Sequence, residues 1–144
     1  MTVRPAVVLA RLAHLALVLS ALRRLRGLRP EDRADMVNVL AAERALHVAA
    51  EAIFDVGHHV LAGRGLPIPS TYREVIPALI HAGVLAPAFE ARLAGLAGLR
   101  NLLVHDYGDI DATQLWAMID TRLEDLEDTH TALAALAELG TSQP

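Results

Sequence analysis

The sequence predicts an all-α fold of about five helices, arranged as one bundle that takes in the whole chain, residues 1–144. Hydrophobic residues make up 53% of the chain but aromatic residues only 3%. The core must therefore be aliphatic, which suits packed helices better than sheets. Apolar residues recur at helical spacing between short polar breaks, and 144 residues are enough to bury a core. These observations predict a single domain with short connections.

The first helix is predicted over residues 6–25. It carries one stripe of leucines at helical spacing, which we expect to face the core: Leu9, Leu12, Leu15, Leu19 and Leu22. Gly27 and Pro30 then break the pattern. The run over 6–22 also resembles an export signal or a membrane anchor, but Arg11 and His14 interrupt it and it is short for a span. We therefore expect a cytoplasmic protein without a membrane partner.

A second helix is predicted as one long segment over residues 31–61. Its apolar side is broad and consists of Val39, Leu40, Ala42, Leu46, Ala49, Ala50, Ile53, Val56 and Val60. A loop over 63–70 follows, and Ser70 is expected to be the N-cap of a third helix that runs to Ala82. Pro77 lies inside this helix, so we expect it to be short or kinked.

Two further helices complete the predicted bundle. Gly83 and Pro87 separate the third helix from a fourth, which is predicted over residues 87–107. Asp111 is expected to be the N-cap of a fifth helix, which ends near Leu139.

The composition excludes several classes of function. There is no cysteine, which excludes disulfides, thiolate metal sites and cysteine nucleophiles. All 13 positively charged side chains are arginine, so lysine-based Schiff-base or P-loop chemistry is excluded as well. The net charge of −4 gives no overall basic footprint for nucleic acid.

Polar side chains cluster in an otherwise apolar segment, LRNLLVHDYGDI at 99–110. On a helix, Arg100 shares a face with Tyr107, and Asn101 shares the adjacent face with His105. Arg100 and His105 are five positions apart and point about 140° away from each other. They can act together only if the arginine bends back or if a second chain supplies its own copies.

A purely structural explanation of this segment is also open. His105 lies in the last turn of the predicted helix, where a cation complements the helix dipole. Gly108 suits the left-handed position after a helix end. Arg100 can pair with a neighbouring carboxylate, and Tyr107 can lie on the bundle with its hydroxyl in water.

The pattern R-N-x-x-x-H-x-Y over 100–107 resembles the signature of HEPN ribonucleases, specifically of HepT-like toxins paired with a minimal nucleotidyltransferase antitoxin. ERALHVAAEAIFDVGHHV at 43–60 is similar to the long second helix of that family. STYREVIPALIHAGVLAP at 70–87 is similar to its third helix and turn. The likeness extends over about residues 35–130.

This resemblance implies an all-helical homodimer, or a higher assembly, in which two motifs face each other across a composite cleft. It implies metal-independent cleavage of RNA by attack of the ribose 2′-hydroxyl on the adjacent phosphorus, with no cofactor. His105 would be the general acid/base. Arg100 would bind the charge that develops on the phosphoryl oxygens, and Asn101 would orient His105.

The resemblance also implies a second partner besides RNA, a cognate minimal nucleotidyltransferase antitoxin. In that family the antitoxin transfers AMP to the motif tyrosine, which is Tyr107 here. The attached groups would keep RNA out by their bulk and their negative charge.

A polar stripe follows the second predicted helix and consists of His47, Glu51, Asp55, His58 and His59. Three interpretations are open. The stripe can be a solvated face with mutual hydrogen bonds, or a metal site, although no zinc motif is present. Alternatively, Glu51 or Asp55 can support the site by holding Arg100 or His105 in place.

Two charged segments are also ambiguous. RRLRGLR at 23–29 can follow RNA phosphates, or it can be a helix end whose cations complement the dipole. LEDLEDTH at 123–130 is expected to be an exposed acidic face, open to a basic partner. A non-catalytic helical module that binds a nucleotidyltransferase is the alternative function, and a metal-dependent enzyme built on the second helix is a third.

Overall fold

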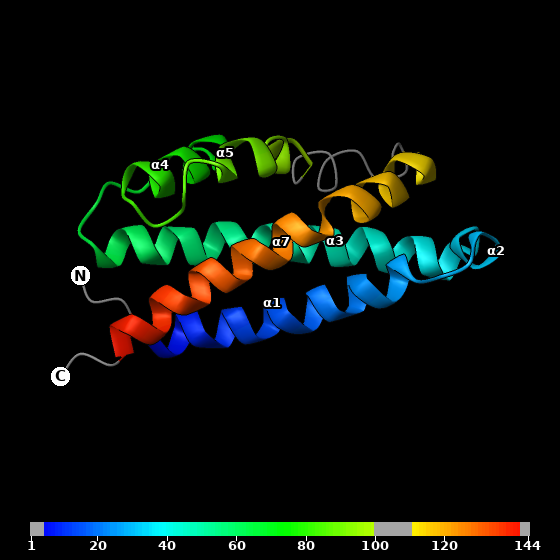
Figure 1. Cartoon of the computed structure of the whole chain (residues 1–144), viewed down its shortest axis with the longest axis horizontal. Helices are drawn as coiled ribbons and strands as arrows, with labels where there is room; N and C mark the ends of the chain where they lie inside the picture. The colour runs from blue at the N-terminus through cyan, green and yellow to red at the C-terminus, as the bar shows by residue number, and fades with distance from the viewer. Residues whose placement is uncertain (1–4, 100–110, 142–144) are drawn as a thin grey trace.

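The computed structural model describes residues 5–99 and 111–141, with side-chain surroundings for 6–99 and 111–137 (Figure 1). The described residues form helices and turns, with no strand among them, so the all-α prediction is confirmed. The elements are α1 (Pro5–Arg26), α2 (Pro30–Arg33), α3 (Met36–Gly63), the 3₁₀ helix η1 (Tyr72–Glu74), α4 (Val75–His81), α5 (Phe89–Arg92) and α7 (Ala112–Thr141). A further helical segment begins at 96 and is described to 99.

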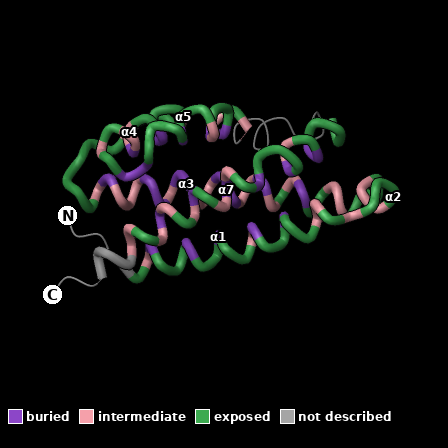
Figure 2. The backbone as a smooth tube through the Cα atoms, viewed as in Figure 1, coloured by how far each residue is buried: buried purple, intermediate pink, exposed green. Residues whose placement is uncertain are grey.

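The long helix α3 is the centre of the bundle. It packs against α1, α7, α4 and α2, and in Figure 1 the layer of α4 and α5 lies on the opposite side of α3 from α1. The buried segments in Figure 2 line the inner faces of these helices. The largest fully buried side chains of α3 are Leu46, Ile53, Phe54, Val56 and Leu61.

The stripe of α1 that faces the core differs from the predicted one by one residue. Val8 is buried together with Leu12, Leu15, Leu19 and Leu22, whereas Leu9 is 41% exposed. The spacing of four from Leu12 back to Val8 places that residue on the inner face, and Leu9 falls beside it.

The segment Ala6–Arg26 of α1 is long and apolar enough to cross a membrane, judged by its length and composition. Core helices and signal sequences near an N-terminus meet the same criterion. Here α1 packs along α3 and α7 through its buried stripe.

The prediction of one helix over 31–61 is wrong, because the chain breaks between α2 and α3. Asp35 ends the extended break as the N-cap of α3, and its Oδ1 accepts a hydrogen bond from Val37 N at 2.9 Å. Trp116 of α7 binds the end of α2 by donating from Nε1 to the carbonyl of Arg33 at 3.1 Å. On the predicted apolar side, Leu40 is 55% exposed.

The contact between α3 and α4 depends on Gly57. A Cβ at this position would lie 2.9 Å from Val75 Cγ1 and 3.1 Å from Leu79 Cδ1, so only glycine allows this close approach. The predicted cap by Ser70 is wrong: Thr71 precedes η1, and no side chain caps it. Pro77 is the third residue of α4, where a missing N–H is tolerated, and the helix continues to His81.

The prediction of a helix over 87–107 is wrong in its first half. α5 ends at Arg92, and a turn with Gly95 at φ +85° precedes the helical segment that begins at 96. The prediction for the last helix is confirmed, because Asp111 Oδ1 accepts a hydrogen bond from Thr113 N at 2.9 Å.

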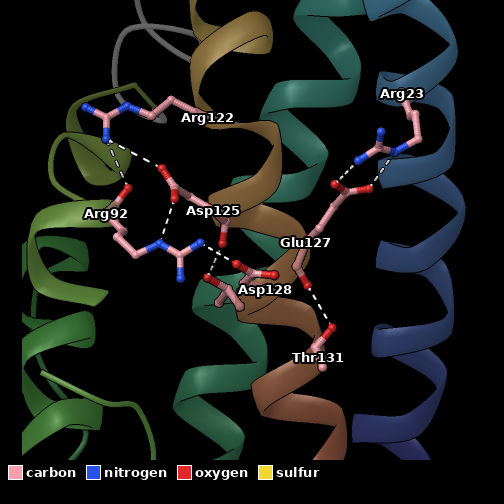
Figure 3. A network of polar contacts seen from close by, with 8 residues as sticks. Arg23, Arg92, Arg122, Asp125, Glu127, Asp128 and Thr131 are labelled. Carbon is pink, nitrogen blue, oxygen red and sulfur yellow. Dashed lines mark hydrogen bonds and ion pairs between the residues drawn. The ribbon is translucent and has the colours of Figure 1, made fainter. Parts of the chain in front are cut away.

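The two charged segments of the sequence meet each other in the fold. Arg23 and Arg26 of α1 form ion pairs with Glu127 and Glu124 of α7, and Figure 3 shows Arg23 reaching Glu127 from the neighbouring helix. Arg33 of α2 forms a two-pronged contact with Asp120, with hydrogen bonds of 2.9 and 2.7 Å. The hydrogen bond from Arg33 lowers the pKa of the Asp120 carboxyl.

We predict that Gly57→Ala destabilises the fold by about 1–3 kcal/mol, although alanine is the better helix former, because the added methyl group meets the buried Val75. Urea unfolding measures the change. The double variant Gly57→Ala/Val75→Ala should lose less stability than the sum of the two single losses. Additive losses would contradict the close contact.

We predict that Asp120→Asn costs about 1 kcal/mol at pH 7. Because the pKa of Asp120 is lowered in the folded protein, its stabilisation is present above the ordinary carboxyl pKa. It is lost as the pH falls through the lowered value, so the difference between the two proteins should shrink in acid. Thermal unfolding at pH 7 and pH 3 measures it, with Glu31→Gln as control for an exposed carboxylate. A difference independent of pH would count against this ion pair.

Candidate functional site

The predicted catalytic segment lies beyond what the structure describes, because Arg100, Asn101, His105 and Tyr107 all fall within 100–110. The structure does describe the residues that lead into this segment from 96–99. It also describes Glu51 and Asp55, the two predicted supporting residues.

The turn before the motif is fixed to α7 by an arginine cluster. Arg92, the last residue of α5, donates from Nε to Asp125 Oδ1 at 2.7 Å and pairs with Asp128. Arg122 donates to the backbone carbonyl of Arg92 at 3.0 Å. Figure 3 shows Arg92 between the two aspartates, with Arg122 above it. The chain therefore leaves α5 from a position that is fixed against α7.

Apolar contacts also hold the residues that follow α5 in the sequence. Leu93 and Leu96 are buried, and Leu99 N donates to the carbonyl of Gly95 at 2.9 Å in the first turn of the new helix. A glycine with positive φ allows the chain to change direction there. The course of residues 96–99, which precede the motif in the sequence, is thus set by Gly95 and the arginine cluster.

Glu51 and Asp55 lie together in a pocket of about 480 Å³ between α1, α3 and η1. They project from the side of α3 that lies away from its buried side chains, one turn apart. The polar or ionisable side chains of the pocket are Arg11, His14, Glu51, Asp55, His58 and Tyr72. The structure thus brings the two predicted supporting residues to one site.

The carboxylates of this pocket have near partners. Arg11 Nη1 lies 2.6 Å from Asp55 Oδ2, an ionic contact whose angle is not that of a hydrogen bond. His59 Nε2 lies 3.8 Å from Asp55 Oδ1, and His47 Nε2 lies 3.3 Å from Glu51 Oε1. Most polar side chains of the stripe therefore have a partner within α3 or on α1.

Tyr72 forms an aromatic wall of the pocket. Its ring centroid lies 5.1 Å from that of Phe54, and it stacks on the imidazole of His58 at 6.2 Å with an angle of 19° between the rings. His58 Nε2 is buried and has no hydrogen-bond partner. A buried ring nitrogen without a partner is unusual in a folded protein.

The stripe on α3 does not form the metal site that the sequence left open. Within the described ranges, no group of three or more histidine and carboxylate side chains is placed to hold one ion. The stripe is divided into a His47–Glu51 pair, an Asp55 contact to Arg11, and a His58 stacked on Tyr72.

Three residues of the pocket were missed by the sequence reasoning. Arg11 and His14 are three positions apart on the exposed side of α1, a spacing that places polar groups on one face. That spacing was a usable signal. Tyr72 comes from a different element, and no local pattern indicates that it meets His58.

Comparisons with known proteins identify the family. The family model described as "Ribonuclease HepT-like" matches residues 18–133. The tRNA nuclease HepT of Aphanizomenon flos-aquae is 28% identical over 123 residues, which cover 85% of this chain and 84% of that protein.

Two solved structures share the fold. The tri-AMPylated HEPN toxin of Shewanella oneidensis, in complex with its MNT antitoxin, has a TM-score of 0.79 at 21% identity and covers 89% of this chain and 96% of that one. YutE of Bacillus subtilis, a cytosolic protein of unknown function, has a TM-score of 0.85 at 21% identity and covers 100% and 98%. The family match extends over most of the chain. The chain belongs to the HepT-like ribonuclease family and is an endoribonuclease of that family.

Proposed function

We propose that this protein is the toxin of a toxin–antitoxin pair and cleaves RNA without a metal ion. The observation that carries the proposal is the pattern Arg100-Asn101-x-x-x-His105-x-Tyr107 in a chain of the HepT-like ribonuclease family. We also propose that residues 1–144 form one domain and act in the cytoplasm.

In the proposed reaction the ribose 2′-oxygen attacks the adjacent phosphorus, and the bond from phosphorus to the 5′-oxygen breaks. One fragment ends in a 2′,3′-cyclic phosphate and the other in a 5′-hydroxyl. His105 moves the proton, because imidazole titrates near neutral pH. Arg100 stabilises the charge on the phosphoryl oxygens with its planar fork of donors. Since the nucleophile is a 2′-hydroxyl, the substrate is RNA and not DNA.

The proposed site is shared between two copies of the chain. Five positions separate Arg100 from His105, so on a helix they would point to different sides. A homodimer that juxtaposes two motifs would supply an arginine and a histidine from each copy. Asn101 would orient His105 from one turn away.

Glu51 and Asp55 are proposed to support the motif from α3. Support for this role comes from their common position in one pocket and from the Arg11 and His47 contacts that orient them. A carboxylate that is already oriented can hold an arginine or imidazole in a fixed position.

Tyr107 is the proposed acceptor of AMP from a minimal nucleotidyltransferase antitoxin. The likeness in fold to an AMPylated toxin from another bacterium supports this partner class. The added phosphates would repel the RNA backbone at the site.

We predict that the purified protein, free of antitoxin, cleaves single-stranded RNA in excess chelator. Arg100→Ala and His105→Ala should each lower the rate about 100-fold or more, because each removes a group that acts in the transition state. The measurement is gel-resolved cleavage, with detection of the cyclic phosphate and a substrate carrying a 2′-deoxy sugar at the cleaved position as control. Unchanged cleavage by both variants, or cleavage only with added metal, would contradict the proposal. If the wild type is silent, intact mass shows whether it carries AMP or is a module that only binds.

We predict that Tyr107→Phe abolishes the mass increase by AMP units on co-expression with the antitoxin, because the acceptor hydroxyl is gone. The chain has two tyrosines, so Tyr72→Phe is the matched control and should still be modified. Modification of Tyr107→Phe would show that another residue is the acceptor.

A further inference from the structure

We infer that the pocket between α1, α3 and η1 binds one nucleotide of the RNA chain, with the base against Tyr72 and the 5′- or 3′-phosphate at Arg11. This inference rests on the proposed function, because it names where the substrate is bound. The pocket lies where the N-terminal part of α1 and the loop before α4 meet the same end of α3 (Figure 1).

The size of the pocket fits such a unit. Its volume of about 480 Å³ lies within the range of about 300–1,000 Å³ that is usual for small-molecule sites. It is lined by aliphatic as well as polar side chains, as sites for amphipathic ligands are.

The aromatic wall offers a surface for a base. Tyr72 and His58 lie nearly parallel, at 19°, and bases of unpaired RNA stack on such rings. The wall is rigid because Tyr72 also packs on Phe54, and Gly57 lets α4 approach α3 closely beside it. Because these side chains are already packed, binding of a base costs little of their conformational entropy.

The polar groups match the edge of a base. His58 Nε2 is buried without a hydrogen-bond partner, and the edge of a base can supply one. Glu51 has a side chain that is 41% exposed, and carboxylates accept hydrogen bonds from the exocyclic amino groups of bases. Glu51 is therefore the carboxylate assigned to the base, since Asp55 is paired with Arg11.

Arg11 is suited to the phosphate. Its side chain is 49% exposed, and it is the one arginine among the described residues that line the pocket. In the free protein it neutralises Asp55, and a phosphate can take up the outer donors of the guanidinium.

The test measures binding and not cleavage. Fluorescence anisotropy of a labelled single-stranded oligoribonucleotide is recorded in chelator with the His105→Ala protein as the parent. In this background Tyr72→Leu should weaken binding about tenfold, in line with the usual loss for one stacked base. Arg11→Gln should weaken it by a similar factor, because it removes the charged donors to the phosphate. Tyr72→Phe should restore most of the affinity that Tyr72→Leu loses, because it keeps the ring.

Arg23→Gln is the matched control. Arg23 is on the same helix, its side chain is 51% exposed, and it is ion-paired to Glu127 on the side of α7. Its removal should change affinity less than twofold, and thermal unfolding of each variant separates lost binding from lost folding.

Equal binding by the parent, Arg11→Gln and Tyr72→Leu would overturn the inference, as would a parent that binds no RNA. Free CMP or AMP that binds as tightly as the oligomer would assign the pocket to a free nucleotide and would also overturn it. The proposed reaction is tested separately. If the protein binds RNA through this pocket but does not cleave it, the inferred nucleotide site stands and the proposed nuclease reaction is contradicted.

Discussion

The burial of one side of α3 is the constraint on which the rest of the structure depends. Small and aliphatic residues of α3 receive α1, α7 and α4, and Gly57 allows the close approach of α4. The side of α3 that these helices leave uncovered carries the polar stripe. Glu51, Asp55 and His58 reach a common pocket as a consequence of how the core is packed.

Charged contacts add to the apolar packing between the outer elements of the bundle. The acidic residues in the middle of α7 receive arginines from α1, α2 and α5, and Figure 3 shows the contacts of Arg23 and Arg92. The contact at Arg92 differs from the others in its position along the chain. Gly95 and then the segment that carries Arg100 and His105 follow it in the sequence. Gly95 and the ion pairs of Arg92 set the direction in which the helical turn at 96–99 begins.

Local signals were enough to predict much of this fold. The all-α class followed from an aliphatic composition, and the cap at Asp111 was read from its position before an apolar run. The break before Asp35 was missed because helical spacing continues across it, and Trp116 supplies its contact from far along the chain. Likewise, no pattern within the sequence pairs Arg23 with Glu127 or Tyr72 with His58, since these contacts exist only after the helices have packed.

The pairing of arginines within the bundle has a consequence for how the enzyme meets its substrate. Most cations of a nucleic-acid-binding surface act at a distance, by steering the polyanion and releasing its counterions. Here Arg23, Arg26, Arg33 and Arg92 are neutralised by α7, and the chain as a whole is acidic, with a net charge of −4. Long-range attraction by these arginines then adds little to the rate at which the protein encounters RNA. Binding of RNA therefore depends more on short-range contacts than on the field of these four arginines.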